Sequence, residues 1–315
     1  MINETERRRA VKMMAQQPWA ILPSALQRMI ACAEHGDAAL RAEYEERQAA
    51  LQRSIAAKPG SVAVLPMFGP ISMRSGDGFF DMMFGGTALD RFMANFRSAL
   101  AAPEVKAVVI DVDSPGGSVD GVTEAADEIF AARGPKPIVA VADTWAMSAA
   151  LHLASQADEL VVTPSGQIGS IGVFMMHVDQ SRALEAEGIA VTFIQAGANK
   201  TEGNSFEPLS DDTRAYFQTE VDGYYAMFVN AMARGRGVSA ATVRSAEWGQ
   251  GRSLLAKDAV AVKMADRVAT LAETLQRLGV GRAAAAAASL ELERERLAIS
   301  RARVRTAEAE LVMGA

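Results

Sequence analysis

Short runs of apolar, often β-branched residues alternate with longer amphipathic segments along the middle of this chain. Residues 61–71, 105–113 and 137–142 predict buried strands, whereas 89–100 and 119–133 carry apolar positions at helical spacing. Strands that are apolar along almost their whole length are typical of a parallel sheet covered on both faces, with right-handed crossovers through the helices. The pattern therefore predicts an α/β fold with a mostly parallel sheet.

Breaks in the pattern divide the chain into three parts. Residues 1–58 are helix-prone and predict a helical N-terminal extension, which the Pro-Gly pair at 59–60 separates from a main domain over 59–280. Residues 281–315 are rich in Ala, Glu and Arg. Their apolar positions recur every seven residues while the complementary positions are polar, which predicts a solvated helical tail rather than a strong coiled coil.

Ser148 stands where a predicted strand gives way to an Ala-rich helix. Small residues follow it, so the backbone can turn tightly and leave the hydroxyl accessible. This placement is similar to a nucleophile elbow, although the G-x-S-x-G pattern is absent. The alternative interpretation is a small residue packed between helix and strand.

Active sites of parallel sheets form from loops at the carboxyl ends of the strands. Residues 114–118 and 143–148 are such loops. A further strand is predicted at 190–194, which would bring the following polar loop, 197–204, and Lys200 within it to the same rim. The glycines of 166–172 are spaced G-x-x-G-x-x-G, which differs from the dinucleotide-binding fingerprint.

A serine attacks a carbonyl only when a neighbouring group takes its proton. Lys200 is one candidate base, since burial against apolar surface can bring a lysine amine into its neutral form. His177 is another, with Asp179 in support. His152 lies one turn after Ser148 and is expected to point into packing.

The Pro-Gly-Gly sequence after the strand at 105–113 suggests how an oxyanion would be bound. An oxyanion hole needs two N–H groups aimed at one point. Gly116 and Gly117 offer N–H groups without a side chain in the way, and Ala149 supplies another just after Ser148. The alternative is a plain tight turn.

Composition and net charge exclude several classes of binding partner. The chain has 315 residues, 50% of them hydrophobic, and a net charge of −6, which argues against nucleic acid or an anionic membrane surface as a partner. Three histidines and one cysteine, without metal-ligand spacing, predict no metal site and no cofactor. The chain has no apolar run long enough for a membrane span and no secretory signal pattern, so we expect a cytoplasmic protein.

Residues 79–86 mix glycine with Phe and Met, which predicts either a surface for an apolar partner or packing onto the core.

Four ordered motifs together resemble the signal peptide peptidase A type serine peptidases, family S49, with the Clp protease/crotonase fold. They are Asp113-Ser-Pro-Gly-Gly-Ser118, Trp145-Ala-Met-Ser-Ala-Ala150, Gly169-Ser-Ile-Gly-Val173 and Lys200-Thr-Glu202. The resemblance covers roughly residues 60–280 and implies a sheet built from repeated ββα units.

The resemblance also implies a role for each motif residue. Ser148 would be the nucleophile, Lys200 the general base and Ser170 the residue that orients the lysine. Gly117 and Ala149 would form the oxyanion hole. Ala149 stands where the family usually has a glycine, which keeps the N–H group.

The segment 18–23 and the Ala/Glu/Arg-rich tail are most similar to phage and prophage members of the family, which process capsid or scaffold proteins. This implies a ring- or dome-shaped homo-oligomer acting on flexible protein segments in the host cytoplasm or prohead. Three alternatives stay open: a cytoplasmic peptidase that degrades signal or other peptides, a crotonase-like acyl-CoA enzyme, and a non-catalytic assembly protein.

Overall fold

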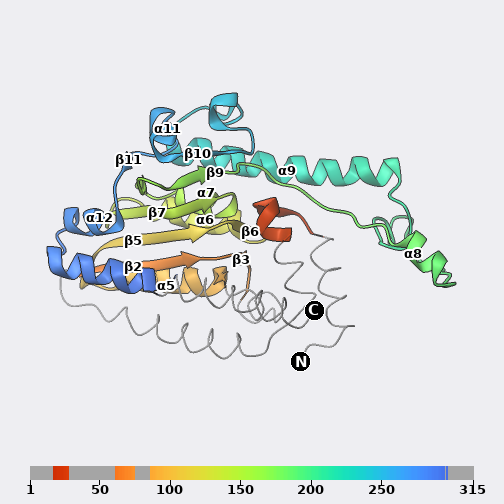
Figure 1. Cartoon of the computed structure of the whole chain (residues 1–315), viewed down its shortest axis with the longest axis horizontal. Helices are drawn as coiled ribbons and strands as arrows, with labels where there is room; N and C mark the ends of the chain where they lie inside the picture. Colours follow the sequence, from red (N-terminus) through yellow and green to blue (C-terminus); the bar gives the residue numbers. More distant parts are fainter. Residues whose placement is uncertain (1–16, 28–60, 75–85, 295, 297–315) are drawn as a thin grey trace, which may run out of the picture.

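A seven-stranded sheet forms the centre of the computed structural model, which describes residues 17–27, 61–74, 86–294 and 296 (Figure 1). The strands of the chain are β1 (Trp19–Ile21), β2 (Ser61–Phe68), β3 (Ile71–Ser72), β4 (Thr87–Ala88), β5 (Val105–Ser114), β6 (Gly116–Ser118), β7 (Ile138–Met147), β8 (Glu159–Val162), β9 (Gln167–Gly169), β10 (Ser253–Leu255) and β11 (Arg267–Val268). The helices are α5 (Leu89–Ala101), α6 (Val122–Ala131), α7 (Ala149–Ala154), α8 (Ser181–Ala186), α9 (Asp211–Arg236), α10 (Ala240–Val243), α11 (Ala256–Ala261) and α12 (Leu271–Arg277), with a 3-10 turn η1 (Ala246–Trp248).

The central sheet is mostly parallel. β2, β5, β7 and β8 pair side by side in parallel. β9 pairs in parallel with the carboxyl-terminal half of β7, and β10 pairs with β9 in antiparallel orientation and forms one edge of the sheet. The predicted α/β fold class with a mostly parallel sheet is therefore confirmed. Most of the predicted N-terminal extension, the loop 79–85 and the tail beyond residue 296 lie outside the described residues.

Helices cover both faces of the sheet because alternate residues of each strand point to opposite sides. On one face, Val108, Ile110 and Ile138 pack with residues of α5, α6, α7 and α9. On the other face, Val109 and Val139 pack with α12 and with a helix over 282–294. Its Ala285 is completely buried, so the first part of the predicted tail is packed against the sheet.

A second, four-stranded sheet lies at the carboxyl end of β5. β6 follows β5 after Pro115 and runs between β3 and β1, in the order β1-β6-β3-β4. β1 was not predicted, because its three residues stand between two prolines just before a segment with helical spacing. A helix does begin at residue 23, immediately after it.

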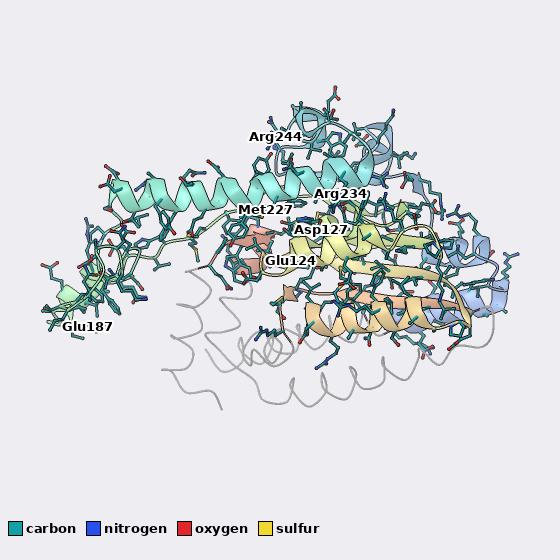
Figure 2. The ribbon with its side chains drawn as sticks, turned by 180° about the vertical axis from the view of Figure 1, so that it is seen from behind. Glu124, Asp127, Glu187, Met227, Arg234 and Arg244 are labelled. Atoms are coloured by element: carbon teal, nitrogen blue, oxygen red, sulfur yellow. The ribbon has the colours of Figure 1, made fainter. Side chains whose placement is uncertain are left out.

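Residues 177–227, which we call the arm, leave the body and return to it. Figure 1 shows α8 at the far end of the arm and α9 leading back, and Figure 2 labels Glu187 near the tip and Arg234 at the root, close to Asp127. Apart from Thr213, the buried residues of α9 lie from Phe228 onwards. The outer part of α9 therefore has little core to pack against.

The predicted strand at 190–194 is wrong. These residues have no regular structure, and the side chains of Ile189, Val191 and Ile194 are 49%, 41% and 100% exposed. A β-branched run forms a strand only beside a partner edge, and no described strand runs next to it in this chain. The long helix predicted over 210–235 is confirmed as α9.

Candidate active site

Ser148 occupies a strained turn between β7 and α7. Its backbone angles are φ 54° and ψ −120°, a combination that non-glycine residues rarely adopt. The amide of Ser148 donates to the carbonyl of Gly169 at 2.8 Å, and its own carbonyl accepts from the amide of His152 at 2.9 Å. A strained strand-to-helix turn that carries a serine is the geometry of a nucleophile elbow. The expectation that the hydroxyl is accessible is wrong for this structure, because Ser148 is completely buried.

β6 lies directly against this turn. A Cβ atom added to Gly116, which has φ +96°, would lie 2.9 Å from Cβ of Ser148 and 3.0 Å from the carbonyl oxygen of Met147. At Gly117 an added Cβ would lie 1.9 Å from the carbonyl oxygen of Ile71. Both positions therefore require glycine, because the backbone of β6 approaches its neighbours too closely for a side chain.

Ser114 fixes the turn that carries these glycines. Its hydroxyl donates to the carbonyl of Gly69 at 2.7 Å and accepts from the amide of Gly116 at 3.2 Å. Sequence reasoning included Ser114 in the motif but gave it no task. A serine placed before Pro-Gly-Gly, where it can bond the backbone two residues on, was the available signal.

Ala149 is the first residue of α7. The amides in the first turn of a helix have no carbonyl of their own helix to bond, so the amide of Ala149 is a donor left over at the N-terminus. Donors of this kind also carry the partial positive charge of the helix end. The structure thus brings Ser148 and Ala149 next to β6, the strand that contains Gly117.

Ser170 lies on the opposite side of Ser148 from β6. It follows Gly169, which bonds the amide of Ser148, and it has φ 56° and is 6% exposed. Its amide donates to the carbonyl of Arg252 at 3.0 Å. Two residues further on, the carbonyl oxygen of Gly172 lies 3.5 Å from Oγ of Ser148. The segment 169–172 therefore lines the nucleophile.

Lys200 is not brought to this place within one chain. It is exposed in the loop 197–204 of the arm, which meets α9 where Gly203 packs against the ring of Phe217. Phe217 precedes Phe228, the residue that packs against α7, by eleven positions, or about 16 Å along the helix. The prediction that Lys200 shares a rim with Ser148 depended on the strand at 190–194, which the structure lacks.

Neither His177 nor His152 forms a pair with Ser148. Nε2 of His177 lies 2.9 Å from the carbonyl oxygen of Asn204 in the arm. The carboxylate of Asp179 accepts from the amide of Ser181, and the hydrogen bonds from Ser181 lower the pKa of Asp179. Among the described residues, we therefore find no Ser-His-Asp arrangement around Ser148.

His152 faces the core instead. Its ring stacks on Phe228 with centroids 4.6 Å apart, and Nε2 is buried with no hydrogen-bond partner among the described residues. Burial lowers the pKa of His152 to about 3, with a further lowering from the charge of Arg234. The expectation that His152 points into packing agrees with this geometry, and its imidazole is neutral throughout the physiological range.

This buried imidazole makes stability depend on pH. The unfolded chain binds a proton at His152 below its ordinary pKa of 6.5, whereas the folded chain does not until about pH 3. Stability from this group is therefore complete above pH 6.5 and decreases as the pH falls, by about 2 kcal/mol at pH 5. His152→Phe should remove that decrease, measured as the difference in unfolding free energy between pH 7 and pH 5 in urea. His177→Gln serves as the control, and equal pH dependence in His152→Phe and the wild type would contradict the assignment.

Two acidic residues and a threonine complete the rim on the β5 side. The hydroxyl of Thr144 donates to Oδ1 of Asp113 at 2.6 Å. Arg296 follows the helix over 282–294 and lies 3.3 Å from Oδ2 of Asp143 and 3.8 Å from Oδ2 of Asp113. Sequence reasoning treated the tail as solvated and missed this contact.

Two negative findings complete the geometry. Within the part of the chain that the structure describes, no group of His, Cys, Asp and Glu residues could hold a metal ion. None of the described helices is long and apolar enough to span a membrane.

Comparison with known proteins adds the following. The sequence profile of Peptidase family S49 matches residues 131–284. The head-tail preconnector protein GP5 of Enterobacteria phage P21 is 37% identical over 186 residues, which are 59% of this chain and 37% of that protein. The capsid assembly protease C of Escherichia phage lambda is 34% identical over 186 residues, 59% of this chain and 42% of that protein. The chain thus spans less than half the length of both relatives. The solved structure of a ClpP1 mutant from Listeria monocytogenes aligns over 72% of this chain and 99% of its own, with 13% identity and a TM-score of 0.41.

Proposed function

We propose that this chain, whose residues 131–284 match the profile of Peptidase family S49, is a serine endopeptidase that hydrolyses peptide bonds in unfolded or flexible protein segments. The observation that carries the proposal is the strained Ser148, held between the glycines of β6 and the N-terminus of α7. Non-glycine residues held in such a backbone conformation cluster at active sites, where the strain positions the reacting group. The chemistry needs no cofactor.

In the proposed reaction, Oγ of Ser148 attacks the carbonyl carbon of the peptide. The amides of Gly117 and Ala149 donate to the oxyanion that forms, a contribution that is often worth a factor of about 10²–10³ in rate for one donor. The amine of Lys200 takes the hydroxyl proton and passes it to the leaving amine. Ser170, which lies beside Ser148, orients that amine.

We assign the base to a second copy of the chain, because Lys200 lies on the arm and away from Ser148 of its own chain. The arm has the surface that such an assembly needs. No described part of the chain covers its exposed apolar side chains, among them Ile189, Val191, Ile194 and, at the inner end in Figure 2, Met227. An arm that reaches a neighbour in the same way around an axis would produce a closed homo-oligomer, a ring or dome.

For the biological setting, we propose the assembly of a phage head, in the prohead or the host cytoplasm. The support is that both phage relatives are named for head-tail connection or capsid assembly, and that they are 34% and 37% identical to this chain. Capsid and scaffold proteins are the corresponding substrates.

The test is complementation between two inactive variants. Ser148→Ala and Lys200→Ala should each abolish cleavage of an unfolded protein. Subunits of the two variants, mixed at equal amounts and allowed to reassemble, should recover about a quarter of the wild-type activity, because a quarter of the sites then combine an intact serine with an intact lysine from the next subunit.

A mixture of Ser148→Ala with the double variant is the matched control and should stay inactive. Activity in Lys200→Ala alone would show that another group is the base. Inactive mixtures beside an active wild type would place serine and lysine in one chain. If the wild type cleaves nothing, the peptidase proposal fails.

A further inference from the structure

The N-terminal strand β1 lies between the two backbone segments that flank Ser148. On one side it pairs antiparallel with β6, with Trp19 opposite Ser118 and Ile21 opposite Gly116. On the other side the amide of Trp19 donates to the carbonyl of Phe174 at 2.8 Å, and the amide of Phe174 donates back at 3.0 Å. β1 therefore fills a slot with one strand edge on each side.

The carbonyl of Ala20 lies close to the turn that carries Ser148. A Cβ atom added to Gly116 would lie 2.2 Å from this oxygen and 2.9 Å from Cβ of Ser148, so the two groups are neighbours across Gly116. The amide of Leu22 donates to the carbonyl of Pro115 at 2.9 Å. Because bonded pairs alternate along an antiparallel ladder, the next bonded pair is Ala20 with Gly117, whose amide is the proposed oxyanion donor.

This is how a peptide substrate would bind. Peptides that add a strand to an exposed edge gain affinity from main-chain hydrogen bonds and specificity from alternate side chains. Two side chains anchor β1 in the protein, since Trp19 and Ile21 are each 2% exposed. The small Ala20 stands between them, at the position beside Ser148.

We propose that residues 19–22 bind in the substrate site of their own chain, and that the peptide bond between Ala20 and Ile21 is a self-cleavage site. The proposal rests on the proposed peptidase function. It assigns the site a preference for an extended segment with a small residue on the N-terminal side of the cut bond.

The reaction follows the proposed mechanism with this bond as substrate. Oγ of Ser148 bonds to the carbonyl carbon of Ala20, and the bond from that carbon to the nitrogen of Ile21 breaks. The hydroxyl proton passes through the lysine amine to Ile21, which becomes a free N-terminus. Water then hydrolyses the ester, which restores Ser148 and leaves a carboxylate on Ala20. Because Lys200 of the same chain is remote, the bond stays intact until a second copy supplies its lysine.

Intact-mass measurement and N-terminal sequencing of the purified full chain test the proposal. The wild type should lose residues 1–20 on incubation and acquire Ile21 as its N-terminus, whereas Ser148→Ala should keep its full mass. An unfolded protein added to the same sample reports general peptidase activity. If the wild type cleaves that protein and its own N-terminus stays intact or is cut elsewhere, the self-cleavage site is refuted while the peptidase function stands. If neither is cleaved, both proposals fail.

A substitution in the strand adds a specific readout. Ala20→Trp should abolish cleavage at this bond, since Ala20 is 3% exposed and its place has no room for a large side chain. Because the large side chain keeps residues 19–22 out of the slot, the slot is open and the added protein should still be cleaved. Ser24→Trp introduces the same side chain at an exposed position and should be processed like the wild type. Equal processing of Ala20→Trp would overturn the placement of Ala20 beside the nucleophile.

Discussion

Gly116→Ala should lower kcat/KM for protein cleavage at least about 100-fold, because it displaces the nucleophile and the oxyanion donor together. The added methyl group would lie 2.9 Å from Cβ of Ser148 and 3.0 Å from the carbonyl of Met147. Neither contact can be relieved by rotating a side chain, so β6 or the turn at Ser148 must move. Steady-state kinetics on an unfolded protein measures the effect.

Gly134→Ala is the matched control for backbone strain. Gly134 also has a positive φ, +113°, but an added Cβ would meet nothing within 4 Å. This variant should cost about 1 kcal/mol of stability, as left-handed backbone does for an alanine, and should keep wild-type activity. If Gly116→Ala retained activity close to that of Gly134→Ala, β6 would not be part of the catalytic site.

Arg133→Met should lower the unfolding free energy by about 2–3 kcal/mol. The guanidinium of Arg133 donates to four carbonyls at the ends of two helices: Gln156 at 2.7 Å, Ala157 at 2.6 Å, Gly235 at 3.0 Å and Ser155 at 3.2 Å. It also lies over the ring of Phe130, 4.5 Å from the centroid. Methionine keeps much of the aliphatic contact and leaves all four carbonyls without this donor. Urea unfolding at pH 7 measures the loss.

Arg97→Met provides the comparison on the surface. Arg97 pairs with Glu128 at 2.6 Å, but the two side chains are 59% and 37% exposed. Exposed ion pairs contribute little, because water screens the charges and the side chains lose freedom when they pair. The urea midpoint of this variant should match that of the wild type within error. A similar loss in both variants would mean that the carbonyls around Arg133 find other donors.

The sheet could be predicted because its buried strands consist mainly of apolar residues, a pattern that is visible in the sequence. β5 was expected at 105–113 and observed at 105–114, since all but two of its residues are buried and apolar side chains fill both faces. β7 was predicted too short. Its outer half, Asp143–Met147, is polar enough to be taken as a loop, yet it pairs with β9, with Trp145 opposite Gln167. Pairing of this kind depends on a distant segment, which no local pattern reports.

The same distinction applies to the predicted site: the part set by neighbouring strands could be predicted, and the part set by a distant segment could not. Ser148 and Ala149 lie next to β6, which contains Gly117, because the carboxyl ends of neighbouring parallel strands must meet, which topology alone dictates. Lys200 could not be placed, because a run of β-branched residues does not say whether its partner strand belongs to the same chain. The position of Ala20 was also beyond prediction, since its ladder joins segments almost a hundred residues apart.

β1 also covers strand edges that could otherwise pair with other copies of the chain. Unpaired strand edges offer rows of amides and carbonyls to any extended segment, and proteins usually protect them. Here the edge of β6 and the backbone at Phe174 are both covered by residues 19–22 of the same chain. In the proposed self-cleavage, residues 19–22 keep these strand edges covered until the bond is cut. The cut that opens the slot to substrates would therefore also expose edges that promote aggregation.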